Sequence, residues 1–231
     1  MKFSRQYAAL LLGLMLASAE GRAADGLNVG DTIPTFGLKP INTDIAGTSL
    51  INVDSFYGDT ATAPKKAIIV SFFATYCAPC KKEMPYLAAL YDAFKDKGLQ
   101  VMLVSIDADK EKMEEAKQLG ADNGVQFPIL WDRFNIVAKR FFVEKLPNVY
   151  VVDATGKVSL NKVGYTEGVT QELLDEVRKH LGEPNDAPVP EVLAQFIPKA
   201  EEPAVEEPAE EVTTSKKKKK KKNKRRKKRK K

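Results

Sequence analysis

The chain has 231 residues, of which 43% are hydrophobic, and its mean hydropathy is −0.32. This length allows one domain of ordinary size with extensions, and the hydropathy excludes a protein with many membrane spans. The net charge of +6 is an average over two unlike parts. Residues 199–231 hold 16 Lys and Arg against 6 Asp and Glu, so residues 1–198 keep 21 of the 37 basic and 25 of the 31 acidic residues. The basic pI of 9.1 therefore belongs to the C-terminal part.

The N-terminus has the pattern of a secretory signal peptide. Lys2 and Arg5 precede an apolar run over residues 8–19. Small residues at Ala17 and Ala19 offer a cleavage site, and residues 21–23 offer a second one. The run is shorter than the roughly 20 residues that span a bilayer. We expect residues 1–23 to be removed on export, and an uncleaved anchor is the alternative. Export across the inner membrane into the periplasm would place the cysteines in an oxidising compartment, where a disulfide persists.

Patterns of strand and helix alternate along the middle of the chain. The predicted strands span residues 65–73, 99–107 and 127–131, followed by a hairpin over 147–153 and 158–164. The predicted helices span residues 79–97, 110–119, 134–142 and 169–181. The first two strands are almost wholly apolar, which is typical of parallel strands covered on both faces. Residues 32–40 and 48–55 are harder to place and could form short antiparallel strands.

The C-terminal part has the composition of unfolded chain. Residues 183–215 contain six prolines and many glutamates, which predicts an extended linker. Within it, residues 191–197 have their apolar side chains on one side, so a short docked helix is an alternative, although it would be marginal alone. Fifteen of the last sixteen residues are Lys or Arg, from Lys216 to Lys231. Such a run repels itself and is predicted to be a disordered tail.

The stretch VSFFATYCAPCKKEMPYL holds the only two cysteines, Cys77 and Cys80. A structural zinc site needs about four Cys or His ligands, and the one histidine, His180, is expected to be exposed at the end of the last helix. A disulfide with two intervening residues closes too small a loop to stabilise the fold much. Cys77 lies between a predicted strand and a helix, whose free N–H groups would stabilise a thiolate. The pattern therefore favours a redox pair.

The sequence around the cysteines resembles the motif of the TlpA/ResA-type thioredoxins, exported thiol-disulfide oxidoreductases of bacteria. Pro85 matches the helix-kinking proline of the family, and Glu83 matches the glutamate of this subgroup. Pro147 falls at the family's cis-proline. The resemblance covers roughly residues 28–182. It implies an α/β, thioredoxin-like fold over residues 24–182, with a central mixed β-sheet flanked by helices and an N-terminal β extension.

The resemblance also implies the chemistry of the pair. Cys77 would attack a partner's disulfide, and Cys80 would resolve the mixed disulfide, so no cofactor is needed beyond the redox-active Cys77–Cys80 disulfide. Glu83 would be a partly buried carboxylate with a raised pKa that helps to move the proton of Cys80. Thioredoxins carry a buried aspartate where this chain has Ser71, which raises the importance of Glu83.

Partner binding is expected on the residues around the pair. Tyr76, in place of the family's tryptophan, should contribute to this surface. The other predicted substrate-binding residues are Ala78, Pro79, Leu146 and Pro147. A cis bond before Pro147 would turn the backbone of Leu146 toward the dithiol, where it can pair with substrate backbone.

The predicted activity is reduction of protein disulfides, of the kind needed for apocytochrome c or a copper-site cysteine pair, with electrons from a membrane thiol donor. A dithiol oxidase is an alternative, because the motif does not set the direction. A Cu(I) chaperone is another, with Met84 as the only nearby extra ligand. A peroxiredoxin-like enzyme is the third, but its P-x-x-x-T-x-x-C motif is absent, because Thr75 lies one residue too close to Cys77.

The basic tail has two interpretations. It could be a solvated tail without a dedicated partner, or it could bind an anionic membrane surface through Lys216 to Lys231. Nucleic acid would bind such a tail in vitro, but export argues against nucleic acid as a partner.

Overall fold

The computed structural model describes residues 26–197. The predictions for the signal peptide, for the basic tail and for the linker beyond residue 197 lie outside the described residues. The elements in chain order are β1 (Gly37–Leu38), α1 (Thr43–Ala46), β2 (Ile51–Asn52), η1 (Val53–Phe56), β3 (Ala67–Phe73), α2 (Ala78–Phe94), η2 (Lys95–Lys97), β4 (Leu99–Ser105), α3 (Glu111–Asp122), β5 (Ile129–Trp131), α4 (Ile136–Arg140), β6 (Asn148–Asp153), β7 (Val158–Val163), α5 (Glu167–Leu181) and α6 (Glu191–Ala194). No helix within the described range is long and apolar enough to cross a membrane.

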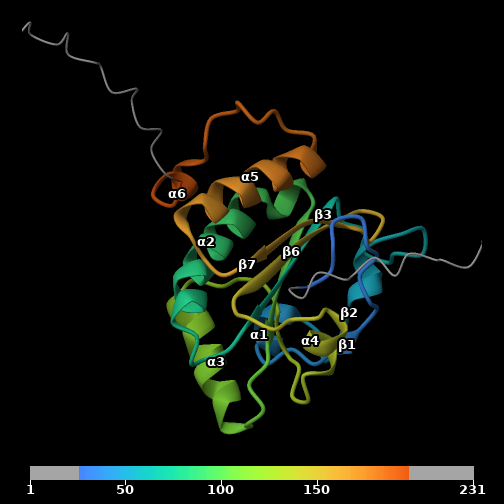
Figure 1. The fold of residues 1–231 in the computed structure, drawn as a ribbon, viewed down its shortest axis with the longest axis vertical. Helices are drawn as coiled ribbons and strands as arrows, with labels where there is room; N and C mark the ends of the chain where they lie inside the picture. The colour runs from blue at the N-terminus through green and yellow to red at the C-terminus, as the bar shows by residue number, and fades with distance from the viewer. Residues whose placement is uncertain (1–25, 198–231) are drawn as a thin grey trace, which may run out of the picture. The chain divides into compact units, whose positions relative to one another are not determined.

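A five-stranded sheet in the order β5-β4-β3-β6-β7 forms the centre of the fold (Figure 1). The pairs β3–β4 and β4–β5 are parallel, and the pairs β3–β6 and β6–β7 are antiparallel. Every residue of β3 and β4 is buried, as their apolar sequences predict. The prediction of a mixed central sheet is therefore confirmed.

The sheet has a hydrophobic core on each face. On one face of the sheet lie α2 and α5 (Figure 1). Their buried side chains pack against alternate residues of the strands, together with Ala116 of α3. Helices α2 and α3 follow successive parallel strands in one direction, and right-handed crossovers then place both on the same face. The N-terminal extension and α4 pack on the other face.

The predicted N-terminal β extension is present as the antiparallel pair β1–β2, in which Gly37 lies opposite Asn52. Two isolated bridges join this extension to the main sheet. Thr32 pairs with Lys157 beside β7, and Pro40 pairs with Leu130 of β5. The extension thus runs across the sheet and covers its second face.

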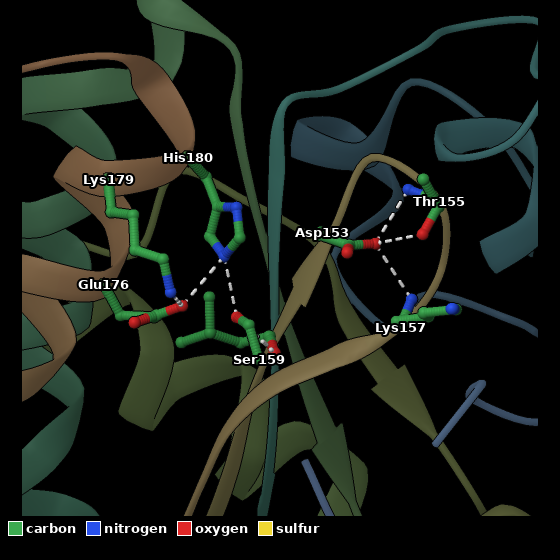
Figure 2. Close-up of polar contacts among 8 residues, drawn as sticks. Asp153, Thr155, Lys157, Ser159, Glu176, Lys179 and His180 are labelled. Carbon is green, nitrogen blue, oxygen red and sulfur yellow. Dashed lines mark hydrogen bonds and ion pairs between the residues drawn. The ribbon is translucent and has the colours of Figure 1, made fainter. Parts of the chain in front are cut away.

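The β6–β7 hairpin turns at Asp153, as its ATGK sequence predicts. The Asp153 carboxylate accepts hydrogen bonds from Thr155 N–H at 2.8 Å, Thr155 Oγ1 at 2.7 Å and Lys157 N–H at 3.0 Å (Figure 2). Burial would raise the pKa of Asp153, but these hydrogen bonds outweigh it and hold the pKa below its ordinary value. Gly156 has φ of 85°, a left-handed conformation that favours glycine.

Residues 183–197, here named the C-terminal strap, differ from the sequence prediction of an extended linker. The strap returns over α5 and ends in α6, which packs on α2 (Figure 1). Leu193 of α6 has no exposed surface and belongs to the core beneath α2 and α5. The proline content of the strap predicted an unfolded linker. Composition alone could not show that the folded domain has a core position for Leu193.

Polar contacts also hold the C-terminal strap in place. The buried Arg178 of α5 donates to the carbonyl oxygens of Asn185 at 3.1 Å and Pro188 at 2.9 Å. Thr170 Oγ1 donates to the carbonyl oxygen of Phe196 at 2.8 Å. The ring of Phe196 meets the ring of Tyr86 edge-on, with centroids 5.8 Å apart. The strap is therefore part of the folded unit.

Candidate active site

The two cysteines lie where β3 ends and α2 begins. Cys77 is the N-cap residue of α2, and the structure joins it to Cys80 by a disulfide with Cα atoms 5.3 Å apart. The Cys80 N–H donates a hydrogen bond to Cys77 Sγ at 3.2 Å. The N–H groups of a helix's first turn have no partner within the helix, and this one donates to the sulfur instead. Pro79 lies in the same turn, where a residue without an N–H loses no helical hydrogen bond. Cys77 is 8% exposed and Cys80 is 2% exposed, so Cys77 is the more accessible cysteine.

Glu83 lies one turn after Cys80 on the same helix and is 1% exposed. Ser71 Oγ, from the middle of β3, donates to Glu83 Oε2 at 2.8 Å. Glu83 Oε1 is buried without a hydrogen-bond partner among residues 26–197. Burial raises the pKa of Glu83 to about 7, and the hydrogen bond from Ser71 lowers it only in part. The site thus contains a buried carboxyl group that is half protonated near neutral pH.

The turn before Cys77 is held by a residue that sequence analysis did not identify. Asp107, which follows β4, accepts hydrogen bonds from Thr75 N–H at 2.9 Å and Thr75 Oγ1 at 3.0 Å. Ser105 Oγ donates to the same carboxylate at 2.9 Å. Parallel strands bring their carboxyl ends to one edge of a sheet. An aspartate directly after the second buried strand could therefore have been predicted to lie near the cysteines, which follow the first.

The predicted cis-proline is also at this edge of the sheet. The Leu146–Pro147 bond is cis, as the resemblance implies. The next residue, Asn148, pairs with Phe72 of β3, so the cis-proline loop and the turn before Cys77 leave the sheet at the same end. Leu146 is half-buried against the core and Pro147 is buried.

The remaining predicted substrate-binding residues form an exposed rim. Tyr76 is 75% exposed, and Ala78 and Pro79 are exposed beside it. A groove of about 590 Å³ opens next to them. Its lining residues are Ala78, Pro79, Lys82, Tyr165, Thr166, Gln195, Phe196 and Ile197. The last three belong to the C-terminal strap, which sequence analysis did not connect with the site.

His180 is less exposed than predicted, because its side chain extends from α5 to Ser159 of β7. Its Nε2 atom is 2.8 Å from Ser159 Oγ and 3.0 Å from Glu176 Oε1 (Figure 2). Only 16% of its side chain is exposed. Both contacts use one ring nitrogen, whereas a Ser-His-acid triad uses both. This cluster therefore joins the helix to the strand and is no hydrolytic site.

The described part of the chain has no group of three His, Cys, Asp or Glu side chains arranged to hold a metal ion. Met84, the extra ligand considered for Cu(I), is 1% exposed and packs in the core under α2.

Comparison with known proteins identifies the family. The model of the AhpC/TSA family matches residues 29–160, more than half of the chain. The chain belongs to the AhpC/TSA family. Thiol-disulfide oxidoreductase ResA of Bacillus cereus is 28% identical over 189 residues, which cover 78% of this chain and 99% of the relative. ResA of Bacillus thuringiensis subsp. konkukian is 30% identical over 155 residues, covering 67% and 79%.

These relatives place this AhpC/TSA-family chain among the TlpA/ResA-like thioredoxins. A candidate thiol:disulfide interchange protein DsbE of Chlorobium tepidum has the same fold, with a TM-score of 0.57 at 24% identity, covering 68% of this chain and 99% of that one. The chain is a thiol-disulfide oxidoreductase of the thioredoxin type, with the Cys77–Cys80 pair.

Proposed function

We propose that the protein reduces disulfides of exported partner proteins, with Cys77 as nucleophile and Cys80 as resolving cysteine. The observation that carries this proposal is the Cys77–Cys80 pair at the N-terminus of α2, with the buried carboxyl group of Glu83 one turn away. The helix N-terminus favours the thiolate form of Cys77. The greater exposure of Cys77 lets a partner reach it first.

Two exchange steps carry two electrons from the enzyme to the partner. The Cys77 thiolate attacks one sulfur of the partner's disulfide, forming a mixed disulfide and releasing the partner's other sulfur as a thiolate. Cys80, once deprotonated, attacks Cys77 Sγ and forms the Cys77–Cys80 disulfide. The partner's second sulfur then leaves as a thiolate and takes up a proton.

Glu83 supplies the proton acceptor for the second step in this proposal. Cys80 is buried, so water reaches its thiol poorly. A carboxyl group with a pKa of about 7 is ionised in half of the molecules at neutral pH and can take the Cys80 proton. Ser71 positions this carboxyl by its hydrogen bond, at the place where thioredoxins carry an aspartate.

The setting proposed for this reaction is the periplasm, after removal of residues 1–23. The partners would be apocytochrome c or a copper-site cysteine pair, and a membrane thiol donor would re-reduce the Cys77–Cys80 disulfide. The basic run from Lys216 to Lys231 would keep the enzyme near an anionic membrane surface and hence near that donor.

Reduction of insulin by dithiothreitol tests the exchange activity. The wild-type protein should accelerate it, and Cys77→Ser should abolish the acceleration, because no thiolate remains to attack the partner. Cys80→Ser should instead accumulate a mixed disulfide through Cys77. A Cu(I) carrier would show no acceleration even as the wild type, and that result would refute the proposal.

The reduction potential tests the direction. A reductase should have a potential well below that of strong oxidants, which lie at about −120 mV. Equilibration of the Cys77–Cys80 pair with a glutathione buffer measures this value. A potential near that of the strong oxidants would identify a dithiol oxidase instead.

A further inference from the structure

The groove beside the dithiol has two walls from distant parts of the chain. Ala78, Pro79 and Lys82 of α2 form one wall, and the loop before α5 adds Tyr165 and Thr166. The C-terminal strap forms the other wall with Gln195, Phe196 and Ile197. Because Ala78 and Pro79 lie between the two cysteines, any protein that joins its sulfur to Cys77 brings neighbouring residues to this groove.

The strap wall is fixed before a partner arrives. Leu193 is fully buried, and Phe196 is held by its contact with Tyr86 and by the hydrogen bond from Thr170. A groove with both walls fixed loses little conformational entropy when it binds a peptide.

The groove combines apolar surface with one positive charge. Pro79, Phe196 and Ile197 supply apolar atoms. Lys82 is exposed and forms no ion pair with any residue of the described range. Its ammonium group is therefore available to an acidic side chain of a bound segment, while Lys81 is exposed on the same turn but does not line the groove.

We propose that the groove binds an extended segment of the partner protein, in which an acidic side chain close to the disulfide pairs with Lys82 while apolar atoms contact Phe196. The inference rests on the proposed exchange function and adds the substrate class. The C-terminal strap is thus a specificity-determining wall of the site.

Single-turnover reduction of two cyclic peptide disulfides by the pre-reduced, full-length mature protein tests this inference. The peptides differ only in a Glu or a Lys beside one cysteine. The wild type should reduce the Glu peptide with about fivefold higher efficiency, which is what a partly exposed ion pair contributes. The difference should lie in the half-saturating peptide concentration, and it should shrink as salt is added.

Two matched pairs of variants separate the groove from its surroundings. Lys82→Glu should abolish or reverse the preference, whereas Lys81→Glu makes the same charge change outside the groove and should keep it. On the strap, Gln195→Glu should weaken the preference, whereas Ala194→Glu, also exposed but outside the groove, should keep it. Equal effects within either pair would overturn the inference.

A small uncharged disulfide separates failure of this inference from failure of the proposed function. Bis(2-hydroxyethyl) disulfide does not fill the groove, so the two variants of each matched pair should reduce it at equal rates. If the wild type reduces neither this compound nor the peptides, the exchange function itself is wrong. If it reduces all three disulfides without a peptide preference, only the groove inference is wrong.

The acidic residues 201–211 of the same chain are the rival occupant, because they follow the strap closely in sequence. Replacing their six glutamates by glutamine in the full-length chain should leave peptide reduction unchanged. A rise in efficiency with the Glu peptide, without a change toward the small disulfide, would assign the groove to the chain's own segment and overturn the inference.

Discussion

Ser71 and Glu83 lie twelve residues apart in the sequence and form one buried hydrogen-bonded pair in the structure. The sequence connects them only by inference, because a serine in place of the family's aspartate raises the importance of the glutamate. The structure joins them by a hydrogen bond of 2.8 Å across the interface between β3 and α2. The carboxyl group thus comes from the helix that carries the cysteines, while the strand contributes only a donor.

The raised pKa of Glu83 predicts a specific pH dependence of stability. Between about pH 4.5 and pH 7 the folded protein keeps a proton on Glu83 that the unfolded chain has released. The free energy of unfolding should therefore fall as the pH rises through this range, by about 3 kcal/mol in total. Glu83→Gln should remove this contribution, as measured by guanidinium unfolding of the oxidised protein at a series of pH values.

Ser71→Ala provides the matching control. Its hydrogen bond lowers the Glu83 pKa, so its loss should raise that pKa and extend the decline in stability above pH 7. If Glu83→Gln leaves the slope unchanged, the assignment of the buried proton to Glu83 is wrong.

The elements of the fold differ in how well the sequence predicted them. The strands β3 and β4 and the helix α2 follow from local patterns, because burial of whole strands and of one helix face leaves a periodic signal. The roles of Asp107 and the C-terminal strap depend on contacts between residues far apart in the chain. The Asp107–Thr75 contact spans 32 residues and leaves no periodic signal.

The strap is the clearest case of tertiary structure overriding composition. Its prolines and glutamates predicted an unfolded linker, yet a few anchors hold it: Leu193 in the core, Phe196 on Tyr86, and carbonyl groups on Arg178. The apolar side of residues 191–197 was visible in the sequence, but the surface of α2 and α5 that receives it was not.

Leu193 is expected to be the main anchor of the strap. Leu193→Ala should cost about 2–5 kcal/mol of local stability. The amides of Leu193 and Phe196, which bond to Pro190 and Leu193 carbonyls, should then exchange with solvent at least tenfold faster relative to β3 amides. Hydrogen exchange measured residue by residue checks this.

Val192→Ala is the control, because Val192 is 40% exposed on the same helix. It should change the exchange of these amides little. Equal acceleration in both variants would show that the stability of α6 does not depend specifically on the burial of Leu193.

At the scale of the whole molecule, charge divides the chain into two parts. Residues 1–198 have 25 acidic and 21 basic residues, whereas residues 199–231 have 16 basic and 6 acidic ones. The resulting charges are −4 and +10. Catalysis by the dithiol and the proposed attraction to an anionic surface should therefore be separable, because they are assigned to different parts of the chain.

Truncation after Thr214 tests this division. The truncated protein should lose sedimentation with anionic lipid vesicles at low salt, since each basic residue near such a surface contributes about 1 kcal/mol, with diminishing returns. It should keep the insulin-reduction rate of the full chain. Vesicles of zwitterionic lipid are the control, and they should bind neither protein.

A full-length protein that does not sediment with anionic vesicles at low salt would contradict the membrane proposal. A truncated protein that binds them as well as the full chain would contradict it too, because the attraction would then come from another part of the molecule.

The position of the strap has a mechanical consequence. Ile197 lines the groove. The chain continues from it into residues 198–231, which include the basic run from Lys216 to Lys231. If that segment is tethered, tension along the chain reaches Ile197 and Phe196 before any other part of the described fold. A pull strong enough to detach α6 would remove one wall of the groove and leave the cysteines in place, so tethering force would change the partner selectivity proposed for the groove.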